Sequence, residues 1–296
     1  MPHHLNLLWM RVTEGVSSGA MPELPEVEAV VRALRPLVVG RKITSCRVLH
    51  PIAVRPSSGH GAKLAAARIE KSLRGRKVTG VTRLGKFLLM PLDRGIVAMH
   101  FRLDGQMVWF DSKETRGHID VAIGFGKGTL GFVDRRHFGR VEFEEDPGKI
   151  AGLAKLGVDP LSKGFTREKF AQLLSKSTLP LKLFLLDQKK VAGIGNIYSN
   201  EAMWLARLKP MRRARSLSPI EAARLHKSIG AVLRRALKCC LHPAPNFRDP
   251  NWWFQGIEDI LNVYGREGKK CRRSDGTILR TEQGGRSTFW CRGCQK

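Results

Sequence analysis

Apolar residues recur at helical spacing directly after a proline near the start of the chain. Val27, Val30 and Leu34 fall on one face of a helix, which predicts an amphipathic helix over 26–37. Pro25 suits the first turn of this helix, because the first helical residues have no intrahelical partner for an N–H group. The first predicted element is therefore a helix with one buried face.

Short β-branched and aromatic runs, separated by glycine-containing turns, follow this helix as far as about residue 150. The predicted strands are 43–48, 87–91, 96–101, 121–125, 130–133 and 140–143. Several short strands with such turns predict a β-sandwich.

The pattern changes after a linker around 152–164. From 167 to 240 the chain is rich in Leu, Ala, Lys and Arg at helical spacing, and 216–221 (Ser-Leu-Ser-Pro-Ile-Glu) is typical of a capped helix start. A Pro-, Asn- and Trp-rich stretch over 243–253 predicts an ordered loop. The pattern predicts an α+β fold with an N-terminal helix and β-sandwich domain, a helical domain and a small C-terminal β-ribbon.

The expected divisions of the chain are an extension over 1–21 that is non-native or removed by processing, a first domain over 22–150, a second over 151–260 and the ribbon over 261–296.

Charge indicates the kind of partner. The 52 Lys and Arg residues exceed the 26 Asp and Glu residues by enough to give a net charge of +26, and the basic residues occur in every region. Such a balance predicts a polyanionic partner. No apolar run approaches the length of a membrane span, and no export signal is evident, so we expect a cytoplasmic protein that binds nucleic acid.

The cysteines near the C-terminus indicate a broken zinc motif. Cys291 and Cys294 form a Cys-x-x-Cys pair, whereas the upstream half has Cys271 followed by Ser274. Serine is a poor zinc ligand. Three thiolates with Asp275 or water could still bind zinc, and a metal-free ribbon is the equal alternative.

The sequence 21–26 (Met-Pro-Glu-Leu-Pro-Glu) carries the most specific chemistry. The nitrogen of an internal proline is an amide and cannot attack carbon. The nitrogen of an N-terminal proline is a secondary amine, which can condense with a sugar aldehyde to an iminium ion, and Glu23 beside Pro22 could transfer protons. This chemistry requires that residues 1–21 be absent from the working molecule, through a later start codon or by cleavage. A proline-rich helix start is the structural alternative.

The stretch 186–198 (Leu-Asp-Gln-Lys-Lys-Val-Ala-Gly-Ile-Gly-Asn-Ile-Tyr) places Gly193 and Gly195 before Asn196. Glycines permit close approach to a phosphate, and the Asn196 amide can donate a hydrogen bond to it. The fingerprints of nucleotide-binding loops are absent from the sequence.

With these motifs, residues 21–296 resemble the formamidopyrimidine-DNA glycosylase family. The resemblance implies an enzyme of base-excision repair that releases oxidised purines and cuts the abasic site by β- and δ-elimination. It assigns Pro22 as the Schiff-base nucleophile, Glu23 as the acid/base and Glu26 as a supporting carboxylate. Lys86, in 83–89 (Arg-Leu-Gly-Lys-Phe-Leu-Leu) where a turn enters a strand, would contact phosphates and donate a proton. Arg286, in 283–289 (Gln-Gly-Gly-Arg-Ser-Thr-Phe), would bind the phosphate at the lesion.

The resemblance also implies that the protein binds damaged double-stranded DNA as a monomer, and it assigns the residues that contact the DNA. Leu103, Arg136 and Phe138 would fill the space left by the extruded base. Lys182 and Asn196 belong to a helix-two-turn-helix that contacts phosphate. His118 and Arg116 lie where the family has histidines that meet DNA, and Arg116 departs from that pattern.

Alternatives remain open. Leu24 favours the purine-directed branch over the related endonuclease VIII type, which prefers oxidised pyrimidines, but Trp252 and Trp253 replace small residues where the family covers the flipped base. A catalytically silent binder of damaged DNA would follow if residues 1–20 are retained. A generic single-strand binder is a further alternative, which the low aromatic content of 7% disfavours.

Overall fold

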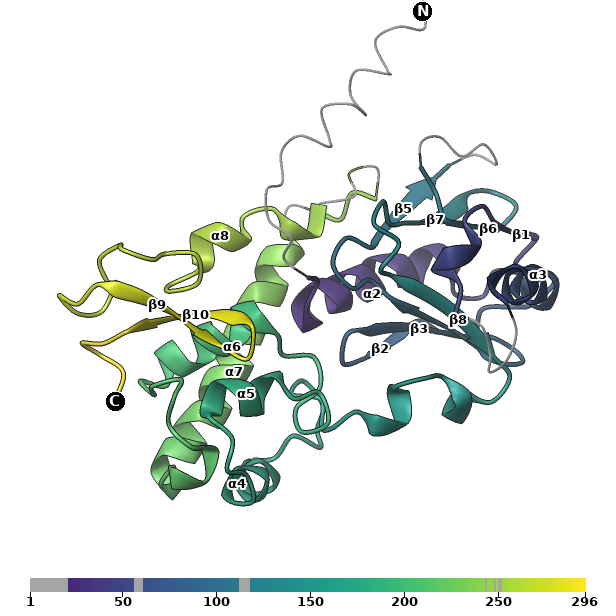
Figure 1. The fold of residues 1–296 in the computed structure, drawn as a ribbon. Helices are drawn as coiled ribbons and strands as arrows, with labels where there is room; N and C mark the ends of the chain where they lie inside the picture. The colour runs from purple at the N-terminus through teal and green to yellow at the C-terminus, as the bar shows by residue number, and fades with distance from the viewer. Residues whose placement is uncertain (1–20, 56–60, 112–117, 243, 248, 250–251) are drawn as a thin grey trace, which may run out of the picture.

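Two lobes lie side by side in the computed structural model, which describes residues 21–55, 61–111, 118–242, 244–247, 249 and 252–296 (Figure 1). The predicted extension therefore lies outside the described residues, apart from Met21. The helices are α2 (Leu24–Val38), α3 (Ala62–Leu73), α4 (Arg167–Ser175), α5 (Leu181–Leu186), α6 (Asn196–Leu205), α7 (Pro219–Cys240) and α8 (Ile257–Ile260). The strands are β1 (Ser45–Val48), β2 (Thr82–Leu84), β3 (Phe87–Pro91), β4 (Ile96–His100), β5 (Gln106–Phe110), β6 (Val121–Gly124), β7 (Thr129–Val133), β8 (Arg140–Glu144), β9 (Ile278–Gln283) and β10 (Arg286–Cys291).

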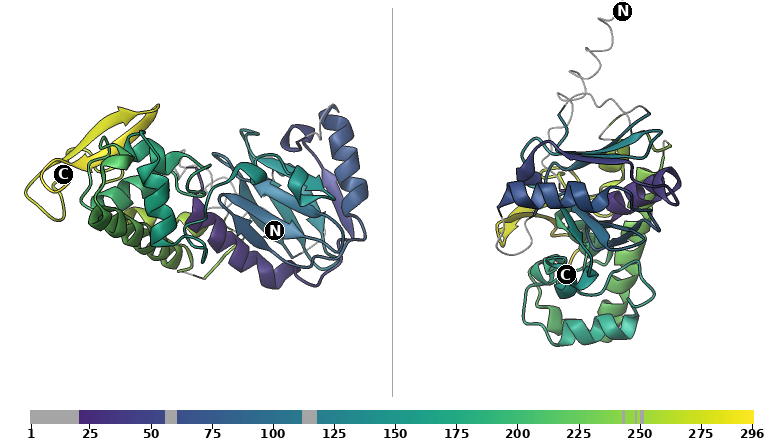
Figure 2. Two further views of the ribbon diagram at one scale, coloured as in Figure 1. Left: turned by 90° about the horizontal axis from the view of Figure 1, so that it is seen from below. Right: turned by 90° about the vertical axis from the view of Figure 1, so that its right-hand side faces the viewer.

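The predicted N-terminal helix is confirmed and begins two residues earlier, with Pro25 in its first turn. Its apolar residues Val27, Val30 and Leu34 are buried. The helix packs against β2 and β3 of the first lobe and against α7 of the second. Figure 2 shows the start of α2 at the junction of the two lobes. The residues at the start of α2 therefore lie at the junction of the two lobes.

Two four-stranded antiparallel sheets form the predicted sandwich, with strand orders β1-β6-β7-β5 and β2-β3-β4-β8. All six predicted strands are present. The pattern missed α3, β2 and β5. β2 has only three residues, which are little buried, so it is a strand because it pairs with β3 and not because of its composition. In that pairing Phe87 lies opposite Leu84, which places Lys86 in the tight turn between them.

The helical lobe follows the predicted pattern. Ser218 caps α7: its hydroxyl accepts from Glu221 N at 3.3 Å, and the Glu221 carboxylate accepts from Ser218 N at 2.9 Å. This reciprocal pair satisfies two N–H groups that the first turn leaves without partners. The helix α7 then packs on α2, α4 and α6. Within the described ranges, no helix combines the length and the apolar composition that a membrane crossing requires.

The C-terminal hairpin β9–β10 lies at the end of the molecule farthest from α3 (Figures 1 and 2). Its turn contains Gly284 and Gly285 with φ of 57° and 68°, a conformation that side-chain-bearing residues rarely adopt. A Cβ on Gly284 would come within 2.7 Å of Leu183 in α5, so the turn packs closely on the helical lobe.

Arg83 joins the lobes through ion pairs that the sequence pattern did not indicate. Its guanidinium donates to Glu28 in α2 at 3.1 Å and to Asp159 in the linker at 3.1 Å, with a side chain that is only 5% exposed. A buried arginine needs such partners, because an unpaired charge there is strongly destabilising. The three residues therefore hold the linker against the first lobe.

Candidate active site

Glu23 lies at the start of α2 with its carboxylate at the N-terminus of α6, in the other lobe. It is 2% exposed, and its two oxygens accept from Gly195 N at 2.7 Å and Ile197 N at 2.8 Å. The first N–H groups of a helix have no internal partner and carry partial positive charge, so they attract a carboxylate. The predicted acid/base is therefore fixed by a helix 172 residues away in sequence.

The glycines before Asn196 are needed for this approach. A Cβ on Gly195 would lie 2.5 Å from both the Glu23 carboxylate and Lys86 Nζ, and one on Gly193 would lie 2.7 Å from Leu24. Only glycine leaves room for the start of α2 at this point. Their close approach in the structure is thus to Glu23 and Leu24, and the expected approach to phosphate stays a prediction.

Lys86 brings a buried ammonium group to the same point. Its side chain is 8% exposed, and its Nζ lies 4.0 Å from Met21 Sδ, next to Pro22. Burial lowers its pKa, while the negative charges of Glu23 and Glu26 oppose this shift. The structure therefore brings together Pro22, Glu23 and Lys86, which were predicted from segments far apart in the chain.

Glu26 binds the backbone of Glu23 and so helps to hold it in place. Its carboxylate accepts from Glu23 N at 2.8 Å and from the buried Tyr198 hydroxyl. Burial, and then the nearby charge of Glu23, raises the pKa of Glu26 from 4.5 to about 7. Tyr198, the last residue of the glycine-containing motif, was not predicted as a site residue, although its position in the first turn of α6 could have indicated it.

Lys182 is fully buried, with its ammonium bound inside the helical lobe. It donates to Asn196 Oδ1 at 2.6 Å, to Asn196 O at 3.2 Å and to Ser199 Oγ at 2.9 Å. Burial lowers its pKa to about 7. Because the Asn196 oxygen is used by Lys182, the amide N–H groups of Asn196 face elsewhere, and the amide also forms a hydrogen bond with the side chain of Tyr264. The direct phosphate contact predicted for Lys182 is untested, and this geometry favours an action through Asn196.

Two neighbouring loops carry the predicted void-filling residues. Arg136 lies in the β7–β8 loop, with its Nε 3.2 Å from Asp104 Oδ2 in the β4–β5 loop and its Cζ 4.8 Å from the Phe138 ring. Phe138 is 43% exposed, and Leu103, next to Asp104, is partly exposed. An exposed phenylalanine beside an arginine is available to a partner. Their contact with DNA stays a prediction.

Of the remaining predicted residues, Arg286 lies near the α6 site and His118 lies in the first lobe. Arg286 is exposed at the start of β10, and its charge reaches Lys86 and Lys182 closely enough to lower the pKa of each. His118 is partly exposed, with its Nε2 3.4 Å from Asp120. Arg116 lies outside the described residues.

Trp252 and Trp253 are 3% and 5% exposed, and their segment packs on α2 and α7. They therefore belong to the core at the junction of the lobes.

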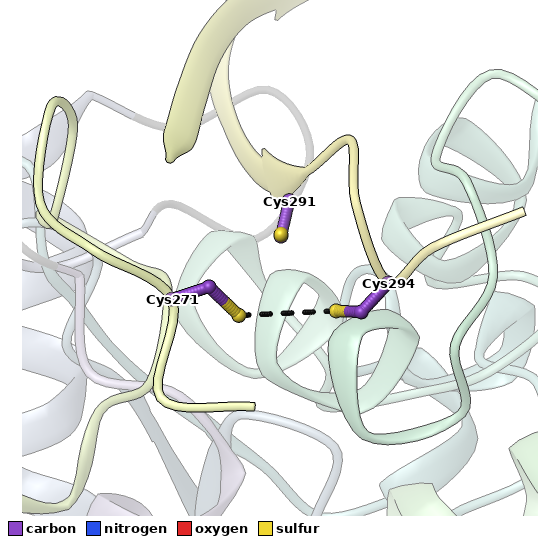
Figure 3. A group of neighbouring side chains, drawn as sticks. All are labelled: Cys271, Cys291 and Cys294. Atoms are coloured by element: carbon purple, nitrogen blue, oxygen red, sulfur yellow. Dashed lines mark hydrogen bonds between the residues drawn. The ribbon is translucent and has the colours of Figure 1, made fainter. Parts of the chain in front are cut away.

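Cys271, Cys291 and Cys294 form a group at the base of the C-terminal hairpin (Figure 3). Their sulfur atoms lie within 4.8 Å of one another, with 3.8 Å between those of Cys271 and Cys294. Ser274 Oγ lies 3.4 Å from Cys291 Sγ, at the corner where the usual motif has a fourth thiol. Three converging thiols fit a thiophilic metal ion.

Asp275 and water were the alternatives for a fourth ligand. The side chain of Asp275 is fully exposed and pairs with Lys270 at 3.1 Å, which favours water.

Comparison with known proteins gives a consistent result. Residues 21–141 match the model of the formamidopyrimidine-DNA glycosylase N-terminal domain, and residues 156–241 match that of the formamidopyrimidine-DNA glycosylase H2TH domain. A formamidopyrimidine-DNA glycosylase of Pelotomaculum thermopropionicum is 36% identical over 281 residues, covering 93% of this chain and 99% of that protein. The one from Chloroflexus aurantiacus is 38% identical over 280 residues, covering 93% and 98%.

Comparison with solved structures gives the same family. The Lactococcus lactis Fpg in complex with DNA containing an abasic site superposes with a TM-score of 0.82 at 31% identity, covering 93% of this chain and 99% of that one. The same enzyme with DNA containing N7-benzyl-Fapy-dG gives a TM-score of 0.81 at 32% identity, covering 93% and 100%.

Proposed function

This chain belongs to the formamidopyrimidine-DNA glycosylase family and is a DNA glycosylase of base-excision repair, and from that premise we propose that it removes oxidised purines from duplex DNA and then cleaves the strand through an imine on Pro22. The observation that carries the proposal is the buried group formed by Glu23 and Lys86 beside Pro22. A nucleophile, a carboxyl group and an ammonium group at one point are the components that this chemistry needs.

Base release begins with attack of the Pro22 amine on C1′ of the damaged nucleotide. The bond from C1′ to the base breaks as the bond from C1′ to the Pro22 nitrogen forms, and the departing base takes up a proton. Glu23 is suited to proton transfer at the sugar, and its carboxylate also stabilises positive charge that develops at C1′.

The Pro22 nitrogen then loses its proton, and the C1′–O4′ bond of the sugar ring breaks as O4′ takes up a proton, which leaves an iminium ion on Pro22. Strand cleavage follows because this iminium ion withdraws electrons from C2′. Loss of a C2′ proton expels the 3′ phosphate, and a second elimination expels the 5′ phosphate. Lys86 would supply a proton to a leaving group, which its lowered pKa favours because a less basic ammonium releases its proton more readily. Arg286 would hold the phosphate at the lesion, as a guanidinium does well.

The partner in this proposal is damaged double-stranded DNA, bound by a monomer. The net charge of +26 and the DNA complexes of the Lactococcus lactis enzyme support it. Leu103, Arg136 and Phe138 would fill the space of the extruded base. Asn196, oriented by Lys182, would donate to a phosphate, and His118 would contact the DNA from the first lobe.

A zinc ion held by Cys271, Cys291 and Cys294 is part of the proposal, since their sulfurs converge as a thiolate site requires. Bound zinc would cross-link the two ends of the hairpin and so stabilise the base of β9–β10. Arg286, at the other end of the hairpin, takes no part in metal binding.

Borohydride trapping on abasic duplex DNA tests the mechanism. A chain begun at Met21, from which the initiator methionine is removed, should give a covalent band, and the 296-residue chain, whose Pro22 nitrogen is an amide, should give none. Absence of the band from both chains would refute the imine. If both chains nevertheless bind lesion duplexes, the protein is a silent recogniser of damage.

Duplexes that carry 8-oxoguanine or an oxidised pyrimidine then test the substrate class. Faster incision of the pyrimidine lesion would place the chain with the endonuclease VIII type.

A further inference from the structure

Three histidines gather around a buried aspartate in the first lobe, apart from the cysteine group. His50 follows β1, His118 and Asp120 precede β6, and His137 lies in the β7–β8 loop. The ring of His50 is stacked on that of His118, with 4.7 Å between centroids, and lies 5.3 Å from that of His137. Three segments of the chain therefore converge on this point.

Asp120 is fully buried, and its two oxygens differ. Oδ2 accepts from Asp134 N at 2.6 Å. Oδ1 lies 2.9 Å from His137 Nδ1 and 3.4 Å from His118 Nε2, but neither contact has hydrogen-bond geometry. Among the residues that the structure describes, none provides a hydrogen-bond partner for Oδ1 or for these two ring nitrogens. A buried polar atom without a partner costs about 1–3 kcal/mol, so a missing ligand is indicated.

We propose that His50, Asp120 and His137 bind a divalent transition-metal ion of the zinc type. Each offers one donor atom, and these atoms lie within 4.8 Å of one another. Ligands at about 2.0–2.1 Å around a tetrahedral ion are roughly 3.3 Å apart, so small side-chain movements would complete the site. Two neutral imidazoles and a carboxylate suit such an ion and leave a fourth position for water.

The position of His137 gives this site a structural consequence. His137 lies between Arg136 and Phe138, and its backbone has a φ of 53°. This left-handed conformation is unfavourable for a residue with a side chain. It lets His137 contact Asp120 while its two neighbours remain exposed. A metal bond to His137 would hold the loop in this conformation and so position Arg136 and Phe138.

The same loop is linked to Asp120 through Asp134. Asp134 is fully buried and accepts from Arg136 N at 3.0 Å and from Gly139 N. Since Asp120 in turn accepts from Asp134 N, the proposed metal ligand and both ends of the loop form one connected network.

Zinc uptake by the untagged 296-residue chain tests the proposal, measured by elemental analysis after equilibration with a zinc buffer. The wild-type chain should retain one more zinc ion per molecule than His137→Asn or His50→Asn. The exposed His242, outside the cluster, provides the matched control, and His242→Asn should retain as much zinc as the wild type. The cysteine group is common to all four chains, so its contribution cancels.

Near-UV circular dichroism identifies variants that remain folded, and either histidine variant suffices. Equal uptake by the wild type and the folded variants would overturn the proposal, as would an equal loss in His242→Asn, which would indicate surface binding. Equal uptake combined with weaker DNA binding by His137→Asn would also overturn it, because the cluster would then be a phosphate contact. None of these outcomes depends on the imine at Pro22.

Discussion

Replacing Glu26 by glutamine should remove a pH dependence of stability that its buried carboxyl group creates. The glutamine oxygen can still accept from Glu23 N, and the new amide can donate to the Tyr198 oxygen, so the shape and most of the bonding are retained. What the variant lacks is a group that ionises. The comparison therefore isolates the effect of titration from the effect of packing.

The magnitude follows from the two pKa values. Burial, aided by the charge of Glu23, raises the pKa of Glu26 from 4.5 to about 7. Between these values the folded chain holds a proton that the unfolded chain has released, so stability falls as the pH rises through this window. As the pH rises from about 5 to about 8.5, ionisation of Glu26 should lower the free energy of unfolding by roughly 2.5 kcal/mol. Most of this decrease should have occurred by the time the pH is slightly above 7.

Urea unfolding of the 296-residue wild type and Glu26→Gln at both pH values provides the assay. Other titrating groups are common to both chains, so the difference between their free energies of unfolding is the quantity to compare. That difference should shift by about 2.5 kcal/mol in favour of the variant at the higher pH. The exposed Glu258 gives a control, since Glu258→Gln should show no such shift. An unchanged difference for Glu26→Gln would refute the raised pKa.

Three further substitutions test the site and the junction of the lobes. Glu23→Gln should slow release of the damaged base more than cleavage of a preformed abasic site, measured by incision of the two duplexes; equal slowing would contradict its acid/base role. Lys182→Met removes the donor that orients Asn196, and duplex affinity should fall about tenfold in a gel-shift titration. Unchanged affinity would mean that the Asn196 amide needs no such support. Asp159→Asn leaves Arg83 with Glu28 as its remaining carboxylate partner and should cost about 2 kcal/mol in urea unfolding, whereas wild-type stability would contradict a role in joining the lobes.

Local features of the fold could be predicted because their causes lie within a few residues. Pro25 and the apolar spacing after it specify the start and the buried face of α2, and the Ser218–Glu221 pair specifies the start of α7. Two adjacent glycines likewise specify the turn of the C-terminal hairpin. Elements stabilised mainly by neighbours, such as β2, left no comparable pattern.

The candidate site was only partly predictable for the same reason. Pro22, Glu23 and Lys86 could be selected by residue type and by resemblance, but not the contact of Glu23 with the first N–H groups of α6. The phosphate contact expected of Lys182 stays a prediction, and its burial against Asn196 could not be predicted, because its depth depends on how α5 packs on α6. The cluster around Asp120 had no motif at all, since its members come from three separate segments.

The sequence by itself determined most of the helices and strands, the strong positive charge and the set of reactive side chains, since these follow from residue type and short-range spacing. Tertiary structure alone decided which carboxyl group is buried, which lysine lies near the Glu23 carboxylate and which histidines meet. Burial and proximity set pKa values and hydrogen-bond partners, and both arise only when segments distant in sequence pack together.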